Sequence, residues 1–276
     1  MTGIKAPGAS RRLPVVGAMA TMSSRTGTFP AALASVLPQV DRLYLFLDGF
    51  ESIPAEIRAQ EKCFAVVTRE PGNLHASSRF LAPRLFGSDA VICLFDDDIL
   101  YPEGYVQRIA AALDEFGGEA LVGFHAFLYL PPHRSYVRDR LMIGFPRSLT
   151  APRRVHELGS GTLGFLSSRF SPDPTSWRYH DVDDLYVAAE ANRSGLFKIA
   201  LPRPQGWIRP LAANQEDSLW RATLKDDRRQ SEIMRYVIAQ HLVFAHELGA
   251  IQTDWWTDSP GAIAPRADRA RAGSPE

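Results

Sequence analysis

The sequence of 276 residues has no excess of charge of either sign and no long apolar run. Lys and Arg together number 31, and Asp and Glu also number 31, so the formal net charge is zero. Nucleic-acid-binding proteins usually carry a basic excess or a basic stripe. We therefore expect no nucleic-acid partner. No stretch approaches the roughly 18 apolar residues of a membrane-spanning helix, so we expect no transmembrane segment.

Cysteine is also scarce. The only two, Cys63 and Cys93, lie in apolar strand-like runs, where buried free thiols are the usual outcome. Near the start, LPVVGAMATM resembles the apolar part of a secretory signal, but Pro14 and Gly17 interrupt it. We interpret this stretch as a first buried strand. We expect a cytoplasmic protein, with peripheral association at the inner face of the membrane left open.

No Ser/Gly linker or charge block divides the chain, and its 45% hydrophobic content is that of an ordinary globular protein. The two ends are rich in Ala, Gly, Pro, Arg and Ser without periodicity, which is typical of disorder. We therefore predict one domain over residues 13–258, between disordered segments at 1–12 and 259–276.

Strand and helix signals alternate between these ends. Strands are predicted at 15–22, 42–47, 63–68, 90–95, 121–130, 161–166 and 197–201. Helices are predicted at 28–37, 54–61, 77–85, 102–116, 183–194 and 232–248, with a loop-rich region at 131–154. This alternation predicts an α/β fold with a mixed, mostly parallel sheet flanked by helices. Ligands bind such sheets at the carboxyl ends of the strands.

The very apolar strand at 90–95 leads directly into Asp96, Asp97 and Asp98. Adjacent carboxylates repel one another unless a cation or solvent screens them. Mn²⁺ or Mg²⁺, shared between one or two carboxylates and substrate phosphates, would remove that repulsion. Alternation along an extended segment puts Asp98 and Asp96 on one side, as metal ligands, and Asp97 on the other, for sugar or ribose hydroxyls. The alternative is an acidic loop that favours the N-terminus of the next helix.

The segment FDDDILYPEGYVQRI at 95–109 resembles the D-x-D segment of glycosyltransferases with the GT-A fold, closest to bacterial family-2-like enzymes of surface polysaccharide synthesis. The segments ATMSSRTGTFPAALASVLPQVDRLYLFLDG at 20–49 and EPGNLHASSRF at 70–80 resemble the upstream part of that family. A bare D-x-D is weak evidence, but the ordered series of segments extends over residues 15–210. The resemblance implies a Rossmann-like GT-A fold and metal-dependent transfer of a sugar from a UDP- or GDP-sugar to a glycan or glycolipid acceptor.

The resemblance also implies donor-binding residues in the loop after the first strand, at the end of the second strand and in the 70–80 segment. The matching positions are Thr21, Ser23, Arg25, Asp48, Asn73 and Arg79. Arg79 would be a cation for the diphosphate. The structural alternatives are ordinary turn residues and a solvated helix arginine.

A second acidic cluster, Asp181, Asp183 and Asp184, lies at the start of a predicted helix. One aspartate is explained by helix capping, but three exceed what a cap requires. Inverting GT-A enzymes carry an acidic pair at such a place, and the resemblance implies Asp184 as general base, with Asp183 as second choice. The reaction needs this group, because a carboxylate must take the proton of the acceptor hydroxyl.

Several aromatic, histidine and apolar residues outside the acidic clusters have weaker sequence signals. GSGTLGF at 159–165 resembles the loop on the acceptor side of the donor pocket, which His156 and Trp207 would help to shape unless they are core residues. His180, His241 and His246 are expected to be structural and not metal ligands. In the last predicted helix, Met234, Val237, Ile238, His241 and Leu242 share one side, which favours core packing, with a homodimer or a membrane surface as alternatives.

Two other classes of protein remain open. In a haloacid-dehalogenase-type phosphotransferase, Asp96 would be the nucleophile, Asp98 the acid/base and Asp183–Asp184 the magnesium pair. Leu100 then stands where that motif has Thr or Val. A non-catalytic sugar-binding module would keep the fold but would not need the second acidic pair.

Overall fold

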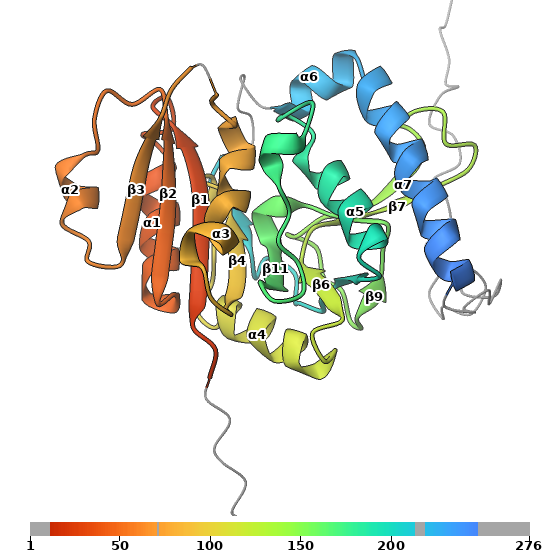
Figure 1. Cartoon of the computed structure of the whole chain (residues 1–276), viewed down its shortest axis with the longest axis horizontal. Coiled ribbons are helices and arrows are strands. Elements are labelled where there is room, and N and C mark those ends of the chain that lie inside the picture. Colours follow the sequence, from red (N-terminus) through yellow and green to blue (C-terminus); the bar gives the residue numbers. More distant parts are fainter. Residues whose placement is uncertain (1–11, 71, 213–218, 248–276) are drawn as a thin grey trace, which may run out of the picture.

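The computed structural model describes residues 12–70, 72–212 and 219–247. Its centre is an eight-stranded sheet with the order β3-β2-β1-β4-β11-β6-β12-β9 (Figure 1). The strands are β1 (Val15–Met22), β2 (Arg42–Asp48), β3 (Cys63–Thr68), β4 (Val91–Phe95), β6 (Ala120–Gly123), β9 (Arg153–Arg154), β11 (Leu163–Leu166) and β12 (Phe197–Ala200). The ends predicted to be disordered lie outside the described residues, except for Arg12.

The sheet is mixed and mostly parallel, as predicted. Strands β3, β2, β1 and β4 run parallel to one another. β11 is antiparallel to both β4 and β6, and β12 is parallel to β6 and antiparallel to β9. Because β11 reverses the direction twice, β6 runs the same way as β4. The carboxyl ends of β1, β2, β4 and β6 therefore lie at one edge of the sheet.

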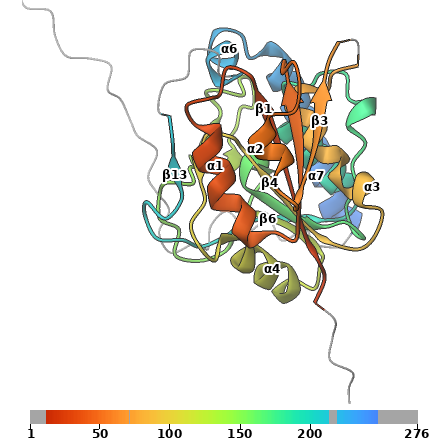
Figure 2. The same ribbon diagram turned by 90° about the vertical axis from the view of Figure 1, so that its left-hand side faces the viewer.

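Helices cover both faces of this sheet. The α-helices are α1 (Phe29–Val36), α2 (Ala55–Arg58), α3 (Ala82–Phe86), α4 (Tyr105–Glu115), α5 (Asp183–Arg193), α6 (Leu219–Lys225) and α7 (Arg228–Glu247). Four 3-10 helices, η1 (Leu37–Gln39), η2 (His75–Leu81), η3 (Ser160–Thr162) and η4 (Pro174–Ser176), join them. Figure 2 shows α1 and α3 on opposite sides of the sheet.

Alternation along the strands explains these layers. In β1, Val15 and Met19 belong to a buried cluster with α1 and α4, whereas Val16 and Ala18 belong to a cluster on the other face, with η2 and α5. Successive side chains of a strand point to opposite faces. A strand with apolar side chains on both faces, as β1 has, therefore needs a covering layer on each side.

Two smaller sheets complete the fold. β7 (Ala126–Tyr129) pairs with β8 (Arg140–Ile143) and β10 (Glu157–Leu158), and β5 (Ile99–Leu100) pairs with β13 (Arg209–Pro210). The single strand predicted at 121–130 is wrong, because β6 and β7 lie in different sheets. The region predicted as loop at 131–154 contains β8 and β9.

Two predicted helices differ from the structure in detail. α4 begins at Tyr105, after Gly104 with a φ of 76°, so Pro102 precedes the helix and is not in its first turn. The spacing of Val106, Ile109, Ala110 and Leu113 in the sequence predicts one apolar face, and the structure buries all of these except Ala110, which is partly buried. The segment predicted as one helix at 77–85 is divided between η2 and α3.

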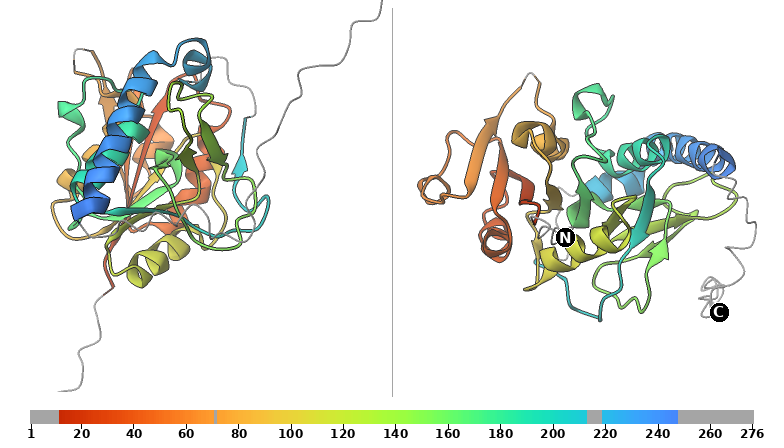
Figure 3. Two further views of the ribbon diagram at one scale, coloured as in Figure 1. Left: turned by 90° about the vertical axis from the view of Figure 1, so that its right-hand side faces the viewer. Right: turned by 60° about the horizontal axis from the view of Figure 1, so that its bottom comes forward.

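Helix α7 packs on α5, and Figures 1 and 3 show the two side by side. Met234 and Val237 are fully buried in a cluster that includes Leu185 and Ala188 of α5. The predicted core packing of this helix is thereby confirmed for Met234 and Val237, whereas the side chains of Leu242 and His246 lie outside the described residues. Cys63 and Cys93 are free thiols, as expected, but only Cys93 is buried, whereas Cys63 is partly exposed. Among the described helices, none combines the length and apolar character needed to cross a bilayer.

Candidate active site

A cavity of about 850 Å³ lies at the edge where β1, β2, β4 and β6 end. Both acidic clusters line it: Asp96, Asp97 and Asp98 after β4, and Asp183 and Asp184 at the start of α5. Residues nearly 90 positions apart in the sequence therefore share one cavity. The predicted convergence of the two clusters is what the structure shows.

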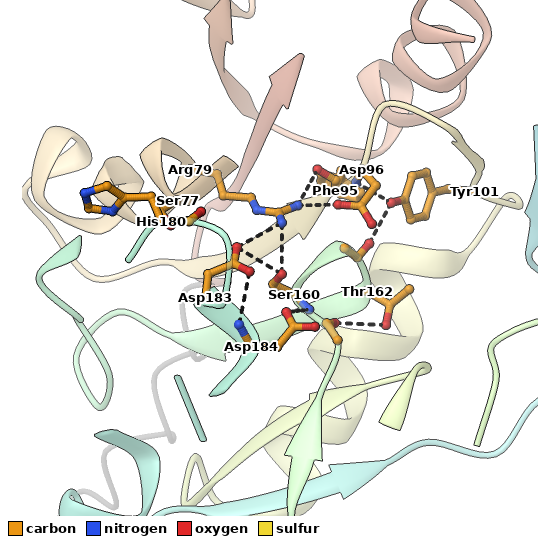
Figure 4. Close-up of polar contacts among 12 residues, drawn as sticks. Ser77, Arg79, Phe95, Asp96, Tyr101, Ser160, Thr162, His180, Asp183 and Asp184 are labelled. Carbon is orange, nitrogen blue, oxygen red and sulfur yellow. Dashed lines mark hydrogen bonds and ion pairs between the residues drawn. The ribbon is translucent and has the colours of Figure 1, made fainter. Parts of the chain in front are cut away.

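Arg79 joins the two clusters (Figure 4). Its Nη1 donates to Asp96 Oδ1 and to the carbonyl oxygen of Phe95, and its Nη2 donates to Asp183 Oδ2 at 3.1 Å. Nη2 also donates to Ser160 Oγ at 2.9 Å. Arg79 is only 5% exposed, and its Nε is buried without a hydrogen-bonding partner among the described residues.

This environment differs from the one expected for Arg79. A solvated or diphosphate-facing cation was expected, but both terminal nitrogens are bonded to protein oxygens. Burial alone would lower the pKa of Arg79, but the carboxylates of Asp96 and Asp183 raise it. The guanidinium therefore stays charged and compensates one carboxylate from each cluster.

The acidic run lies in a turn. Asp97 and Asp98 form a tight turn between β4 and β5, so the alternation assumed for an extended segment is wrong. Burial, together with the neighbouring Asp96 and Asp97 carboxylates, raises the pKa of Asp98 to about 7. Burial also raises the pKa of Asp97. The run therefore holds more negative charge than its protein surroundings compensate.

The donor set suits a hard divalent cation that is completed by substrate. No three His, Cys, Asp or Glu side chains within the described ranges form a ready metal cage. Mg²⁺ and similar ions are commonly held by one or two carboxylates plus substrate phosphates, which needs no such cage. Because Asp96 Oδ1 is bonded to Arg79, Asp98 is the carboxylate best placed for that role.

Tyr101 and the segment at 159–165, which we call the glycine-rich segment, hold Asp96 in place. The Asp96 N–H donates to Tyr101 Oη at 2.7 Å, and Tyr101 Oη donates to the Gly161 carbonyl oxygen at 2.6 Å. A Cβ on Gly161 would lie 1.8 Å from Asp96 Oδ2, so this approach requires glycine. No role was predicted for Tyr101, although it belongs to the segment at 95–109 that resembles the D-x-D segment.

The two carboxylates of α5 have different surroundings. Asp183 is 6% exposed and is paired with Arg79. Asp184 Oδ1 accepts a hydrogen bond from the Ser160 N–H at 2.7 Å. Burial, followed by the charges of Asp183 and Glu157, raises the pKa of Asp184 well above its ordinary value. Asp184, unlike Asp183, has no ion pair with Arg79.

The other residues predicted to bind the nucleotide-sugar donor lie around the ends of β1 and β2. Thr21, Arg25 and Asp48 line the cavity, but Ser23 and Asn73 do not. Asn73 Nδ2 donates to Asp48 Oδ1 at 2.7 Å, and His75 Nδ1 lies 2.8 Å from Asp48 Oδ2. Asn73 therefore positions Asp48. His75 was not predicted; it lines the cavity with a φ of 47°, which is uncommon outside glycine.

Most of the histidine and tryptophan residues considered for the site pack against other aromatic side chains and do not line the cavity. His156 stacks on Tyr129, and Trp207 packs on Phe124, so neither lines the cavity. His241 packs on His156, away from the cavity. Of the three histidines considered as metal ligands, His180 lines the cavity, and the side chain of His246 is not described.

Comparisons with known proteins give little beyond this geometry. No family model matches the chain, and no curated protein matches it. Among solved structures, the chain is similar to mannosyltransferase PcManGT from Pyrobaculum calidifontis, in complex with GDP-Man and Mn²⁺. The sequence identity is 13%, the TM-score is 0.47, and the match covers 89% of this chain and 78% of that one.

Proposed function

We propose that this protein is a divalent-cation-dependent glycosyltransferase that moves a sugar from a UDP- or GDP-sugar to a hydroxyl of a glycan or glycolipid. The observation that carries the proposal is the cavity of about 850 Å³ lined by both acidic clusters. One cluster suits a cation and a diphosphate, and the other offers a carboxylate to an acceptor. Glycosyl transfer needs these two groups on either side of the reacting carbon.

The residues divide the cavity into regions. Thr21, Arg25 and Asp48, at the ends of β1 and β2, would hold the nucleoside, with Asp97 available to a hydroxyl. Asp98, with Asp96 beside it, would hold Mn²⁺ or Mg²⁺ together with the donor phosphates. When bound, the cation supplies positive charge that stabilises the departing diphosphate.

Asp184 would be the general base of an inverting reaction. Its raised pKa favours proton uptake, and its hydrogen bond from the Ser160 N–H fixes one carboxylate oxygen. The other oxygen remains for the acceptor hydroxyl. Asp183 is the second choice because its carboxylate is already paired with Arg79.

The phosphotransferase alternative needs Asp96 as a free nucleophile. In the structure, Asp96 Oδ1 is paired with Arg79, and Oδ2 lies against Gly161. Neither oxygen is poised to attack phosphorus. A sugar-binding module without catalysis would not explain why a carboxylate of raised pKa, Asp184, lines the cavity.

Donor binding and transfer can be tested separately. We expect one UDP- or GDP-sugar to raise the melting temperature only with Mn²⁺ or Mg²⁺, because Asp98 needs a cation before it can accept a diphosphate. Asp98→Asn should remove this metal-dependent stabilisation. Asp184→Asn should keep it but lower kcat by roughly 100- to 10,000-fold, as expected for loss of a general base.

The exposed Asp114 of α4 provides the matched control, because Asp114→Asn makes the same chemical change far from the cavity. Its donor binding and kcat should equal those of the wild type. Release of phosphate from an aryl phosphate, without stabilisation by any nucleotide sugar, would reject the proposal in favour of the phosphotransferase.

A further inference from the structure

His125 lines the same cavity but has no part in the chemistry above. It lies in the two-residue bend between β6 and β7, at the edge where β1 and β4 also end. Its N–H donates to Thr162 Oγ1 at 2.9 Å, and its carbonyl oxygen accepts from the Gly159 N–H at 2.8 Å. Both backbone groups are thus tied to the glycine-rich segment, so the position of His125 is fixed.

The imidazole of His125 has an apolar setting. Its ring packs against Phe127, with centroids 4.9 Å apart, and against Phe145 at 5.6 Å. A Cβ on Gly159 would lie 2.8 Å from the ring atom Cδ2, so the absence of a side chain there makes room for the ring. Burial lowers the pKa of His125 to about 4, so the ring is neutral near pH 7.

The surroundings also indicate which nitrogen carries the proton. Nδ1 is buried and has no hydrogen-bonding partner among the described residues. A neutral imidazole has one N–H, and a buried N–H without an acceptor is costly. The proton is therefore favoured on Nε2, the nitrogen left to meet a ligand in the cavity. His125 offers that ligand one uncharged hydrogen-bond donor.

The sheet order places this donor far from the nucleoside region. β1, β4, β11 and β6 are successive neighbours, so the end of β6 lies about 14 Å from the end of β1, at ~4.8 Å per strand. The acidic run after β4 lies between them. In a nucleotide sugar, the sugar follows the diphosphate on the side away from the nucleoside.

We propose that His125 and Phe145 form the subsite for the transferred sugar, in which His125 Nε2–H donates to a sugar hydroxyl and Phe145 covers an apolar part of the ring. This inference rests on the proposed glycosyltransferase function and adds a specificity-determining residue to it. It places hydroxyl recognition of the donor sugar on the bend after β6 and the turn after β8, apart from the nucleoside region at the ends of β1 and β2.

The test compares His125→Phe, which keeps a flat ring without a donor, with His125→Gln, which keeps an N–H near the position of Nε2. Binding is measured by calorimetry with Mn²⁺ for bare UDP or GDP and for the nucleotide sugar that stabilises the wild type. We expect His125→Phe to weaken nucleotide-sugar binding roughly 5- to 10-fold, as for one lost hydrogen bond, and to leave bare-nucleotide binding unchanged. His125→Gln should restore part of the loss.

Each other outcome overturns a specific claim. Unchanged sugar binding in His125→Phe, or an increase in KM for the acceptor alone, rejects the sugar subsite while the glycosyltransferase proposal stands. Equal weakening of bare nucleotide and nucleotide sugar rejects it as well, because His125 would then support the cavity as a whole. Failure of the wild type to bind any UDP or GDP compound rejects the proposed function itself.

Discussion

Asp96 lies against a residue that has no side chain. A Cβ at Gly161 would stand 1.8 Å from Asp96 Oδ2 and 2.1 Å from its Cγ, far inside any contact distance. The nearby hydrogen bonds through Tyr101 leave the two segments little freedom to separate. The smallest substitution at this position must therefore displace the acidic run or the glycine-rich segment.

We expect Gly161→Ala to abolish the Mn²⁺-dependent stabilisation by a nucleoside diphosphate, because displacement of Asp96 also moves Asp98 on the same turn. Thermal melting with and without Mn²⁺ measures this effect. Gly27→Ala is the matched control, since a Cβ on Gly27 meets nothing within 4 Å. Metal-dependent stabilisation that survives equally in both variants would contradict the predicted role of this contact.

At the scale of elements, β12 carries a buried lysine beneath α5. Lys198 is 3% exposed, and its Nζ donates to Asn192 Oδ1 and to the Ala188 carbonyl oxygen of the helix. Burial lowers the pKa of Lys198 to about 7, against an ordinary value of 10.5. The unfolded chain therefore binds this proton more tightly than the folded protein.

This difference predicts a dependence of stability on pH. Between pH 7 and 10.5 the unfolded state binds more protons at Lys198, so its contribution to the free energy of unfolding rises with pH through this window. We expect Lys198→Met to flatten that rise in urea unfolding experiments at pH 7, 8 and 9. Lys225→Met, at an exposed position, should keep the wild-type slope. A free energy of unfolding that falls from pH 7 to 9 in the wild type, but not in Lys198→Met, would contradict the predicted direction.

Elements whose periodicity matches one environment were predictable from the sequence. β1 and β3 have the predicted bounds, and the apolar face of α4 was identified correctly. The predictions fail where one apolar run forms two strands that pair in different sheets. Residues 121–130 are apolar apart from His125, and periodicity cannot show that β6 pairs with β11 while β7 pairs with β8 and β10. The pairing partners are distant in the chain, so local pattern carries no information about them.

For the molecule as a whole, α7 completes one wall of the cavity. Arg229, in its first turn, donates to Asp181 at 2.9 Å and lies 4.1 Å from the centre of the Tyr179 ring, and all three residues line the cavity. The helix is held to α5 through Met234, Val237 and the hydrogen bond from Asn192 Nδ2 to the Val237 carbonyl oxygen. Loss of α7 packing should therefore affect both stability and the cavity.

We expect Met234→Ala to lower the free energy of unfolding by about 2–4 kcal/mol, because it leaves a hole between α5 and α7. Circular dichroism and tryptophan fluorescence should report one common unfolding transition in urea. Tyr236→Ala, on the exposed side of the same helix, should cost less than about 1 kcal/mol. An early transition seen by one probe alone would show that α7 unfolds as a separate unit.

The site was predictable as a meeting of two acidic clusters but not as a network. The end of a strand was enough to place Asp98 at the edge of the sheet, whereas Asp184 was assigned to the same site only through the family resemblance. The bridge of Arg79 to Asp183 joins residues 104 positions apart, and the exposure of an arginine cannot be read from its neighbours in the chain. His75 and His125 were missed for the same reason, since single histidines in apolar or turn segments carry no pattern.

The guanidinium of Arg79 is a rigid planar group, and it is bonded at one end to Asp96 and at the other to Asp183. The spacing of the two acidic clusters is consequently linked to the covalent dimensions of one side chain. A compound that is too long or too short for this separation would not contact both clusters at once. In the design of inhibitors for this protein, the distance between the two clusters can be treated as constant.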